Sequence, residues 1–138
     1  YMGTKDMIEL TSVLKRNLAK YYGETDKFQK AIELCEEVII KAKEYSLILA
    51  MPDAYAEMAW NMIQQIERGE RDKAEIVLCK KYLRQGYAAA AISKQNVLKD
   101  SINKYYTEYF KEAIYLPSPS PNGEPHRKIC SSGFACSQ

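Results

Sequence analysis

The stretch Asp26-Lys27-Phe28-Gln29-Lys30-Ala31 decides the fold, because a comparable stretch recurs as Gly69-Glu70-Arg71-Asp72-Lys73-Ala74. Each stretch joins a turn to the start of an amphipathic helix, and a comparable helical element precedes each, at residues 17–22 and 57–62. The recurrence predicts two helical hairpins. A small residue, Ala31 or Ala74, stands where the second helix of each hairpin should cross the first, since small side chains let helix backbones approach closely.

Apolar residues recur every three or four positions through most of the chain, which predicts an all-α fold of about five helices. We expect these helices at about residues 6–22, 27–45, 53–67, 72–92 and 95–113, separated by short turn signals. In the first helix one stripe holds the large apolar residues, and we expect it to face the core: Met7, Leu10, Leu14, Leu18 and Tyr21.

Composition divides the chain into two parts. The sequence has 138 residues, of which 46% are hydrophobic, which is enough for one compact domain. Four of the five prolines follow residue 116. We therefore expect a tetratricopeptide-like helical repeat domain at residues 1–115 and a Pro/Ser-rich, Cys-containing, disordered tail at residues 116–138. The net charge of only +2 argues against a strongly basic nucleic-acid-binding protein.

The sequence offers little support for an enzyme. Cys35 and Cys79 fall within apolar stripes with no His nearby, so we expect inert, buried thiols and neither a cofactor nor a metal site. In the tail, disorder competes with three alternatives: a zinc site at His126, Cys130 and Cys136, a Cys130–Cys136 disulfide, and the core of a modified secreted peptide. The absence of a signal sequence and of a long apolar run predicts a cytoplasmic protein that does not enter membranes.

The first hairpin resembles a tetratricopeptide repeat. Residues 14–39 carry apolar and small residues at the signature positions of that repeat: Leu18, Ala19, Tyr22, Phe28 and Ala31. The second hairpin resembles the repeat more loosely, because its spacing from Ala59 to Ala74 is longer and Arg71 replaces the turn aromatic. The resemblance implies stacked hairpins whose first helices line a concave surface.

Residues 14–110 as a whole are similar to the C-terminal repeat region of bacterial helix-turn-helix regulators of the lambda-repressor-like (XRE) class. Three phrases carry this likeness: Tyr22-Gly23-Glu24, Lys30-Ala31-Ile32-Glu33-Leu34-Cys35 and Lys80-Lys81-Tyr82-Leu83-Arg84-Gln85. The resemblance implies a peptide- or protein-binding regulatory domain of a transcription regulator, with the DNA-binding domain upstream of these residues. The alternative is a standalone adaptor that joins protein partners.

Mapping the repeat onto the chain gives a candidate peptide-binding surface. Arg16, Lys20 and Glu24 fall on the concave face of the first hairpin, and Trp60 and Gln64 on that of the second. We expect the two cations to hold a carboxylate and Trp60 to supply a flat apolar contact. In the peptide-pheromone receptors related to these regulators, Asn side chains on the inner helices bind the peptide backbone. The resemblance therefore implies a similar role for Asn17 and Asn61. The alternative interpretation is a solvated charged face with Trp60 in the repeat core.

The fifth helix is rich in aromatic residues, which allow two arrangements. Two hairpins and one helix bury less than the three repeats usually needed for independent stability. We therefore expect an exposed apolar end that a homodimer would cover. The alternative is a capping helix whose aromatic residues pack back on the fourth helix. The aromatic residues are Tyr105, Tyr106, Tyr109, Phe110 and Tyr115. No stripe of basic residues accompanies them, so we expect no direct nucleic-acid contact by this part of the protein.

Overall fold

The computed structural model describes residues 3–114, and this range is built of helices. The five α-helices begin and end within four residues of the limits expected from the sequence: α1 (Thr4–Glu24), α2 (Phe28–Glu44), α3 (Met51–Glu67), α4 (Ile76–Ile92) and α5 (Asn96–Phe110). Two short 3-10 helices, η1 (Ile48–Ala50) and η2 (Lys73–Glu75), precede α3 and α4. The predicted disordered tail, with its candidate disulfide and zinc ligands, lies outside the described residues.

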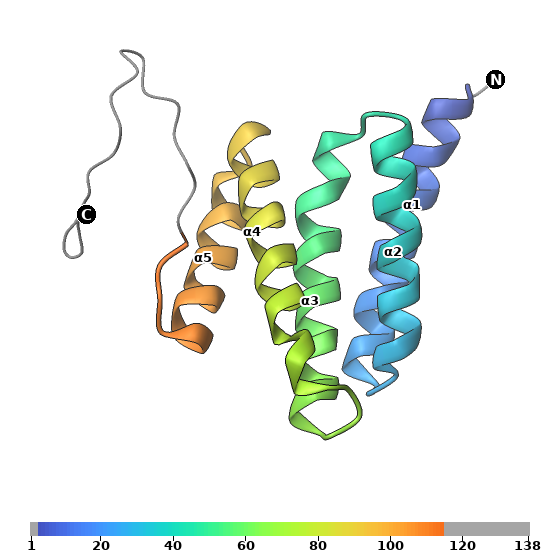
Figure 1. Cartoon of the computed structure of the whole chain (residues 1–138). Coiled ribbons are helices and arrows are strands. Elements are labelled where there is room, and N and C mark those ends of the chain that lie inside the picture. The colour runs from blue at the N-terminus through green and yellow to red at the C-terminus, as the bar shows by residue number, and fades with distance from the viewer. Residues whose placement is uncertain (1–2, 115–138) are drawn as a thin grey trace, which may run out of the picture.

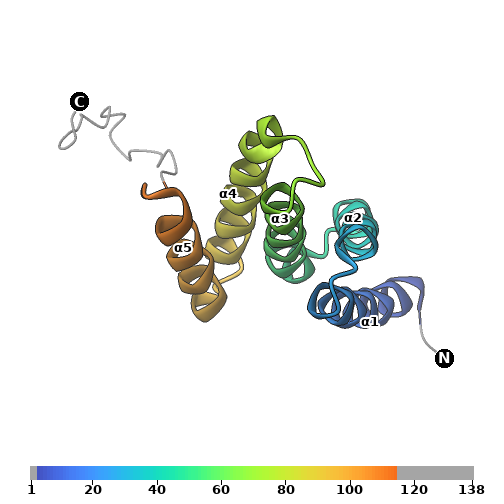
Figure 2. The ribbon, with the colours of Figure 1, turned by 90° about the horizontal axis from the view of Figure 1, so that it is seen from below.

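The helices pack side by side in chain order, each against the next (Figure 1). Seen from below, α1, α3 and α5 lie on one side of the stack and α2 and α4 on the other (Figure 2). On the first side α3 is set back between α1 and α5, and we call this side the concave face. The stacked helical hairpins expected from the sequence are confirmed. No helix within residues 3–114 is long and apolar enough to cross a membrane.

Small residues occupy the helix crossings, although not all of those expected. Ala31 is fully buried, as predicted. The prediction for Ala74 is wrong, because this residue is exposed within η2. The Asp72 side chain accepts a hydrogen bond from the Ala74 backbone N–H at 3.0 Å, which caps a 3-10 turn and delays the α-helix. Cys79 takes the crossing position instead. It is fully buried and is the fourth residue of α4, just as Ala31 is the fourth residue of α2.

The apolar stripe of α1 does not face the core, which corrects a second expectation. Its five large residues are 42–60% exposed: Met7, Leu10, Leu14, Leu18 and Tyr21. The buried residues of α1 are instead the small ones, Ser12, Ala19 and Gly23. At Gly23 an added Cβ would lie 3.0 Å from Asn61 Oδ1 of α3, so the helices are too close for a large side chain. Close packing therefore turns the large residues outward.

The aromatic residues of α5 pack back on α4, as the capping alternative expects. Tyr106 is 1% exposed, and its hydroxyl accepts a hydrogen bond from Arg84 at 3.0 Å. The same hydroxyl donates to the Glu112 carboxylate at 2.7 Å. The rings of Tyr106 and Phe110 lie 4.9 Å apart, and Lys80 of α4 lies over the Phe110 ring. The aromatic face of α5 is therefore occupied by α4, whereas the large apolar residues of α1 remain exposed.

Replacement of Gly86 in α4 tests the close approach of α3 and α4. An added Cβ would lie 3.1 Å from the Pro52 carbonyl oxygen and 3.2 Å from Tyr55 Cβ. We expect Gly86→Ala to lower the free energy of unfolding by about 1–3 kcal/mol through overpacking, despite the higher helix propensity of Ala. Urea unfolding measures this change, and Lys81→Ala compared with Lys81→Gly gives the propensity difference at an exposed site of α4. Stabilisation by Gly86→Ala would contradict the packing described.

The buried thiols supply a second test of the core. Cys35 and Cys79 are fully buried, and this burial raises the pKa of Cys35 to about 12 and that of Cys79 to about 11. In a Cys130→Ser/Cys136→Ser variant we expect both thiols to resist an aromatic disulfide reagent at pH 8 until urea unfolds the protein. Rapid reaction of either thiol in the native protein would show that the core is more open than described.

Candidate functional site

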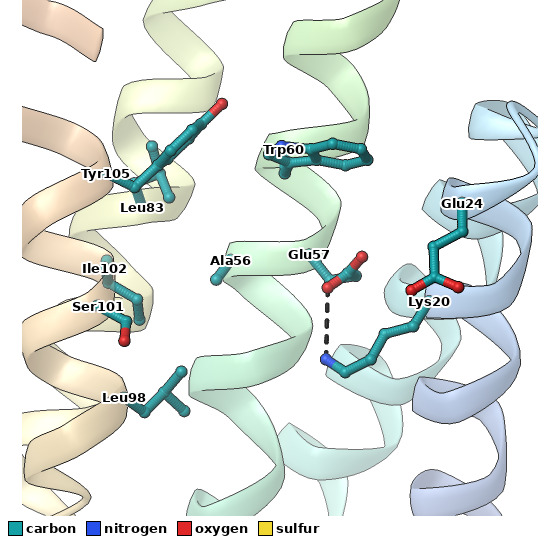
Figure 3. A pocket seen from close by; sticks show the side chains of 10 residues that line it. All are labelled: Lys20, Glu24, Ala56, Glu57, Trp60, Leu83, Leu98, Ser101, Ile102 and Tyr105. Carbon is teal, nitrogen blue, oxygen red and sulfur yellow. Dashed lines mark hydrogen bonds and ion pairs between the residues drawn. The ribbon is translucent and has the colours of Figure 1, made fainter. Parts of the chain in front are cut away.

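An apolar cavity of about 380 Å³ opens on the concave face (Figure 3). Helix α3 lies at its centre, with α5 on one side and α1 on the other. Most of its lining is aliphatic or aromatic, and we call it the concave pocket. Its ten lining residues are Lys20, Glu24, Ala56, Glu57, Trp60, Leu83, Leu98, Ser101, Ile102 and Tyr105. A cavity of this size and lining has the character of a ligand site.

Trp60 belongs both to the wall of the concave pocket and to the packing between the helices. Its ring meets the buried Phe28 ring of α2 edge to face, with centroids 6.2 Å apart. Its far edge lies against Gly23 of α1, where an added Cβ would be 3.5 Å from Trp60 Cζ3. The indole is thus held in place before any ligand arrives, which lowers the entropy cost of using it as a contact surface.

A cluster of charged side chains joins α1 to α3 beside the concave pocket. The Lys20 ammonium lies 2.9 Å from both carboxylate oxygens of Asp53 and 3.4 Å from Glu57 Oε1. Arg16 lies 3.8 Å from Asp53, and its buried Nε has no hydrogen-bond partner within residues 3–114. We call these four residues the α1–α3 charge cluster. Both cations that the sequence assigned to a ligand carboxylate already have carboxylates beside them.

Burial and charge act in opposite directions on the pKa values in this cluster. Burial raises the pKa of Glu57, and the neighbouring Lys20 only partly offsets that effect. Burial lowers the pKa of Lys20, but its hydrogen bonds and charge interactions with Asp53 and Glu57 outweigh this, so the net pKa is raised. Lys20 therefore stays charged at neutral pH, while Glu57 takes up a proton more readily than an exposed glutamate would.

The structure brings together three of the predicted site residues. Lys20, Glu24 and Trp60 line the concave pocket. Arg16, one turn before Lys20, lines a second hollow of about 310 Å³ between α1 and the η1 segment. Lys20, Glu24 and Trp60 thus share one hollow, while Arg16 lies in another. Whether a ligand uses them stays a prediction.

The other predicted site residues lie away from the pocket. Asn61 is fully buried, and its side-chain amide donates to the Glu57 carbonyl at 2.7 Å, so it is closed to a ligand. Asn17 is exposed and lies on the same outer side of α1 as Leu14, three residues further along the helix. Gln64 is half-buried and belongs to none of the hollows described here. Neither Asn17 nor Asn61 lines the concave pocket, and the backbone-binding role implied for them stays a prediction.

Sequence reasoning missed the wall that α5 contributes. Four residues at helical spacing line the pocket there: Leu98, Ser101, Ile102 and Tyr105. A signal was present, because α5 follows α4 as α3 follows α2, and so occupies the place of a third hairpin's first helix. The first helices of stacked hairpins line the concave surface. Helix α5 thus both packs on α4 and lines the concave pocket.

Comparison with known proteins gives no identification, because no family model, no curated protein and no solved structure matches the chain. By its fold, the part of the chain that the structure describes is an all-helical domain of five α-helices, in which consecutive helices pack side by side.

The raised pKa of Glu57 predicts a pH effect on stability. The folded state binds the Glu57 proton more tightly than the unfolded state, so this group lowers the free energy of unfolding as the pH rises above 4.5. Glu57→Gln removes the contribution. We expect the stability of Glu57→Gln relative to the unsubstituted protein to increase as urea unfolding is repeated from pH 4 to pH 7. Glu36→Gln, at an exposed position on α2, is the control, and a flat or falling difference for Glu57→Gln would contradict the prediction.

Proposed function

We propose that this domain is a tetratricopeptide-like regulatory module that binds an extended peptide or protein segment on its concave face. The observation that carries the proposal is the concave pocket, an apolar cavity with contributions from α1, α3, α4 and α5. The similarity of residues 14–110 to the repeat region of XRE-class regulators supports a cytoplasmic bacterial transcription regulator as the parent protein. In this proposal the domain acts by binding and catalyses no reaction.

The shape of the pocket favours one large apolar side chain of the ligand as the anchor. Trp60 and Tyr105 flank the opening from α3 and α5, and Leu98 and Ile102 continue the α5 wall (Figure 3). Rigid aromatic residues at the edge of a desolvated pocket are typical of binding hot spots. A cavity of about 380 Å³ lies at the small end of ligand sites. It therefore suits a side chain such as Leu, Met or Phe better than a folded surface.

The charges beside the pocket favour a basic ligand. Arg16 and Lys20 are outnumbered by the three carboxylates of Glu24, Asp53 and Glu57, and Lys20 is already paired. A ligand carboxylate would have to displace Asp53 or Glu57 from Lys20, at the cost of leaving a partly buried charge without its partner. We therefore propose that the apolar anchor is next to a Lys, an Arg or an amino terminus, which departs from the carboxylate expected from the sequence.

Ligand binding in this pocket offers a physical route to regulation. Helices α1 and α5 touch α3 through few contacts, and each packs mainly on one neighbour, α2 or α4. A ligand held between α1 and α5 would favour one spacing of the two helices over others and so shift the population of states. In a regulator this shift would be passed on to the attached DNA-binding domains. A standalone adaptor would use the same pocket, and it would differ in having no DNA-binding domain joined to it.

Binding can be followed directly, because Trp60 is the only tryptophan in the sequence. We expect its fluorescence to change on titration with a nine-residue peptide that places Leu between two lysines. The same peptide with glutamates in place of the lysines should bind at least about tenfold more weakly, a difference of about 1.4 kcal/mol.

A matched pair of variants separates the concave pocket from nonspecific binding. Ala56→Phe fills the pocket, and we expect it to abolish binding of the lysine-flanked peptide. Ala91→Phe makes the same change at an exposed position of α4 and should leave the affinity unchanged. Equal affinity of Ala56→Phe and the unsubstituted protein, or no binding of either peptide at about 1 mM, would overturn the proposal.

A further inference from the structure

The outer side of α1 carries a continuous apolar surface with no partner within residues 3–114. We call it the outer stripe: Met7, Leu10, Leu14, Leu18 and Tyr21, each 42–60% exposed. Helix α1 lies at one end of the stack, and no other described helix lies beyond it (Figure 2). Monomeric proteins rarely expose contiguous apolar patches larger than a few hundred Å², and larger ones mark interaction sites.

The outer stripe is also free of charge. The residues that share this side of the helix between Met7 and Tyr21 are Thr11 and Asn17, which are polar but uncharged. The nearby cations are engaged elsewhere, since Lys15 pairs with Glu37 of α2 at 2.8 Å and Lys20 with Asp53 of α3. The stripe therefore offers about 20 Å of helix length that can be dehydrated without burying a charge.

The spacing of the outer stripe points to the identity of its partner. The five residues follow one another at steps of three, four, four and three, so the pattern reads the same from either end of the helix. Such a stripe is symmetric about Leu14. A second α1 laid against it antiparallel would place Leu14 against Leu14, Leu10 against Leu18 and Met7 against Tyr21. An isologous interface with a two-fold axis requires this kind of self-complementarity.

We propose that two copies of this chain associate through their outer stripes, with the two α1 helices antiparallel and Leu14 on the two-fold axis. The mean step of 3.5 residues is that of helices which pack with interlocking side chains over several turns. The pairing lies opposite the surface of α1 that contacts α2 and α3, so it leaves the concave pocket open. It also places the dimer contact on α1 instead of the aromatic α5.

The size of the stripe sets the expected strength of the dimer. A helix-to-helix contact of this length buries on the order of 1,000 Å² in total, at the lower limit for specific complexes. Interfaces of this size are typical of weak, transient complexes. We therefore expect a concentration-dependent dimer of the full chain.

Sedimentation of the full chain tests the proposal. Leu14→Glu places two carboxylates face to face on the axis, and we expect it to raise the dimer dissociation constant at least ~100-fold. Leu14 is 60% exposed, so helix content and urea unfolding of the separated subunit should be unchanged. Val77→Glu introduces the same charge at a 67% exposed apolar residue of α4 and should leave the dimer intact. An unsubstituted protein that stays monomeric at about 1 mM, or equal effects of the two variants, would overturn the proposal.

Cysteine crosslinking tests the antiparallel orientation in a Cys130→Ser/Cys136→Ser background. We expect Leu14→Cys to form a disulfide-linked dimer under mild oxidation, because the two residues meet on the axis. Met7→Cys alone should not crosslink, since the two copies would lie about 20 Å apart along the helix. A mixture of Met7→Cys and Tyr21→Cys chains should crosslink. Efficient crosslinking of Met7→Cys to itself would show a parallel pairing and contradict the geometry proposed.

Discussion

The close approach of neighbouring helices, made possible by small residues at their crossings, is the constraint from which the rest of this structure follows. Ala19, Ala31, Ala59 and Cys79 are all fully inaccessible to solvent, and an added Cβ at Gly86 would lie only 3.1 Å from the Pro52 carbonyl oxygen of α3. At such short separations a large side chain cannot be placed between the helices without displacing them. The large apolar residues of α1 are consequently turned away from the stack, where they form the outer stripe.

The same close packing shapes the concave face. Since α3 is held tightly between α2 and α4, it lies set back from α1 and α5, and a cavity remains in front of it (Figure 2). The α1–α3 charge cluster then fixes α1 beside this cavity through Lys20 and its two carboxylate partners. Partly buried charges in this arrangement stabilise the geometry as long as they stay paired, because an unpaired buried charge is costly. The chemistry offered to a ligand is thus an apolar recess with a carboxylate-rich edge.

Helical periodicity was enough to predict the number, order and approximate limits of the helices, because turn signals between them are local. Periodicity could not show which face of α1 is buried. An apolar stripe normally marks the buried side, yet here Ser12, Ala19 and Gly23 are buried and Leu14 is exposed. The start of α4 was missed for a similar reason, since the Asp72 cap competes with a helix that would otherwise begin earlier.

The candidate site was predictable in part. The repeat pattern placed Lys20, Glu24 and Trp60 on one face, and all three line the concave pocket, because such positions depend on spacing within a hairpin. The α5 wall could have been expected from the order of the helices, since α5 stands where the first helix of a third hairpin would. The burial of Asn61 and the pairing of Lys20 with Asp53 depend on contacts between hairpins, which no spacing within a single helix encodes.

We propose the concave face, lined by α1, α3 and α5, as the ligand-binding face of this domain. Methyl chemical shifts measured by NMR during titration with the lysine-flanked peptide test it most directly. We predict that shifts are concentrated at Ala56, Leu98 and Ile102, with little change at Ile40 of α2 or Val77 of α4. Shifts concentrated at the exposed residues Ile40 and Val77, which lie outside the concave pocket, would contradict it.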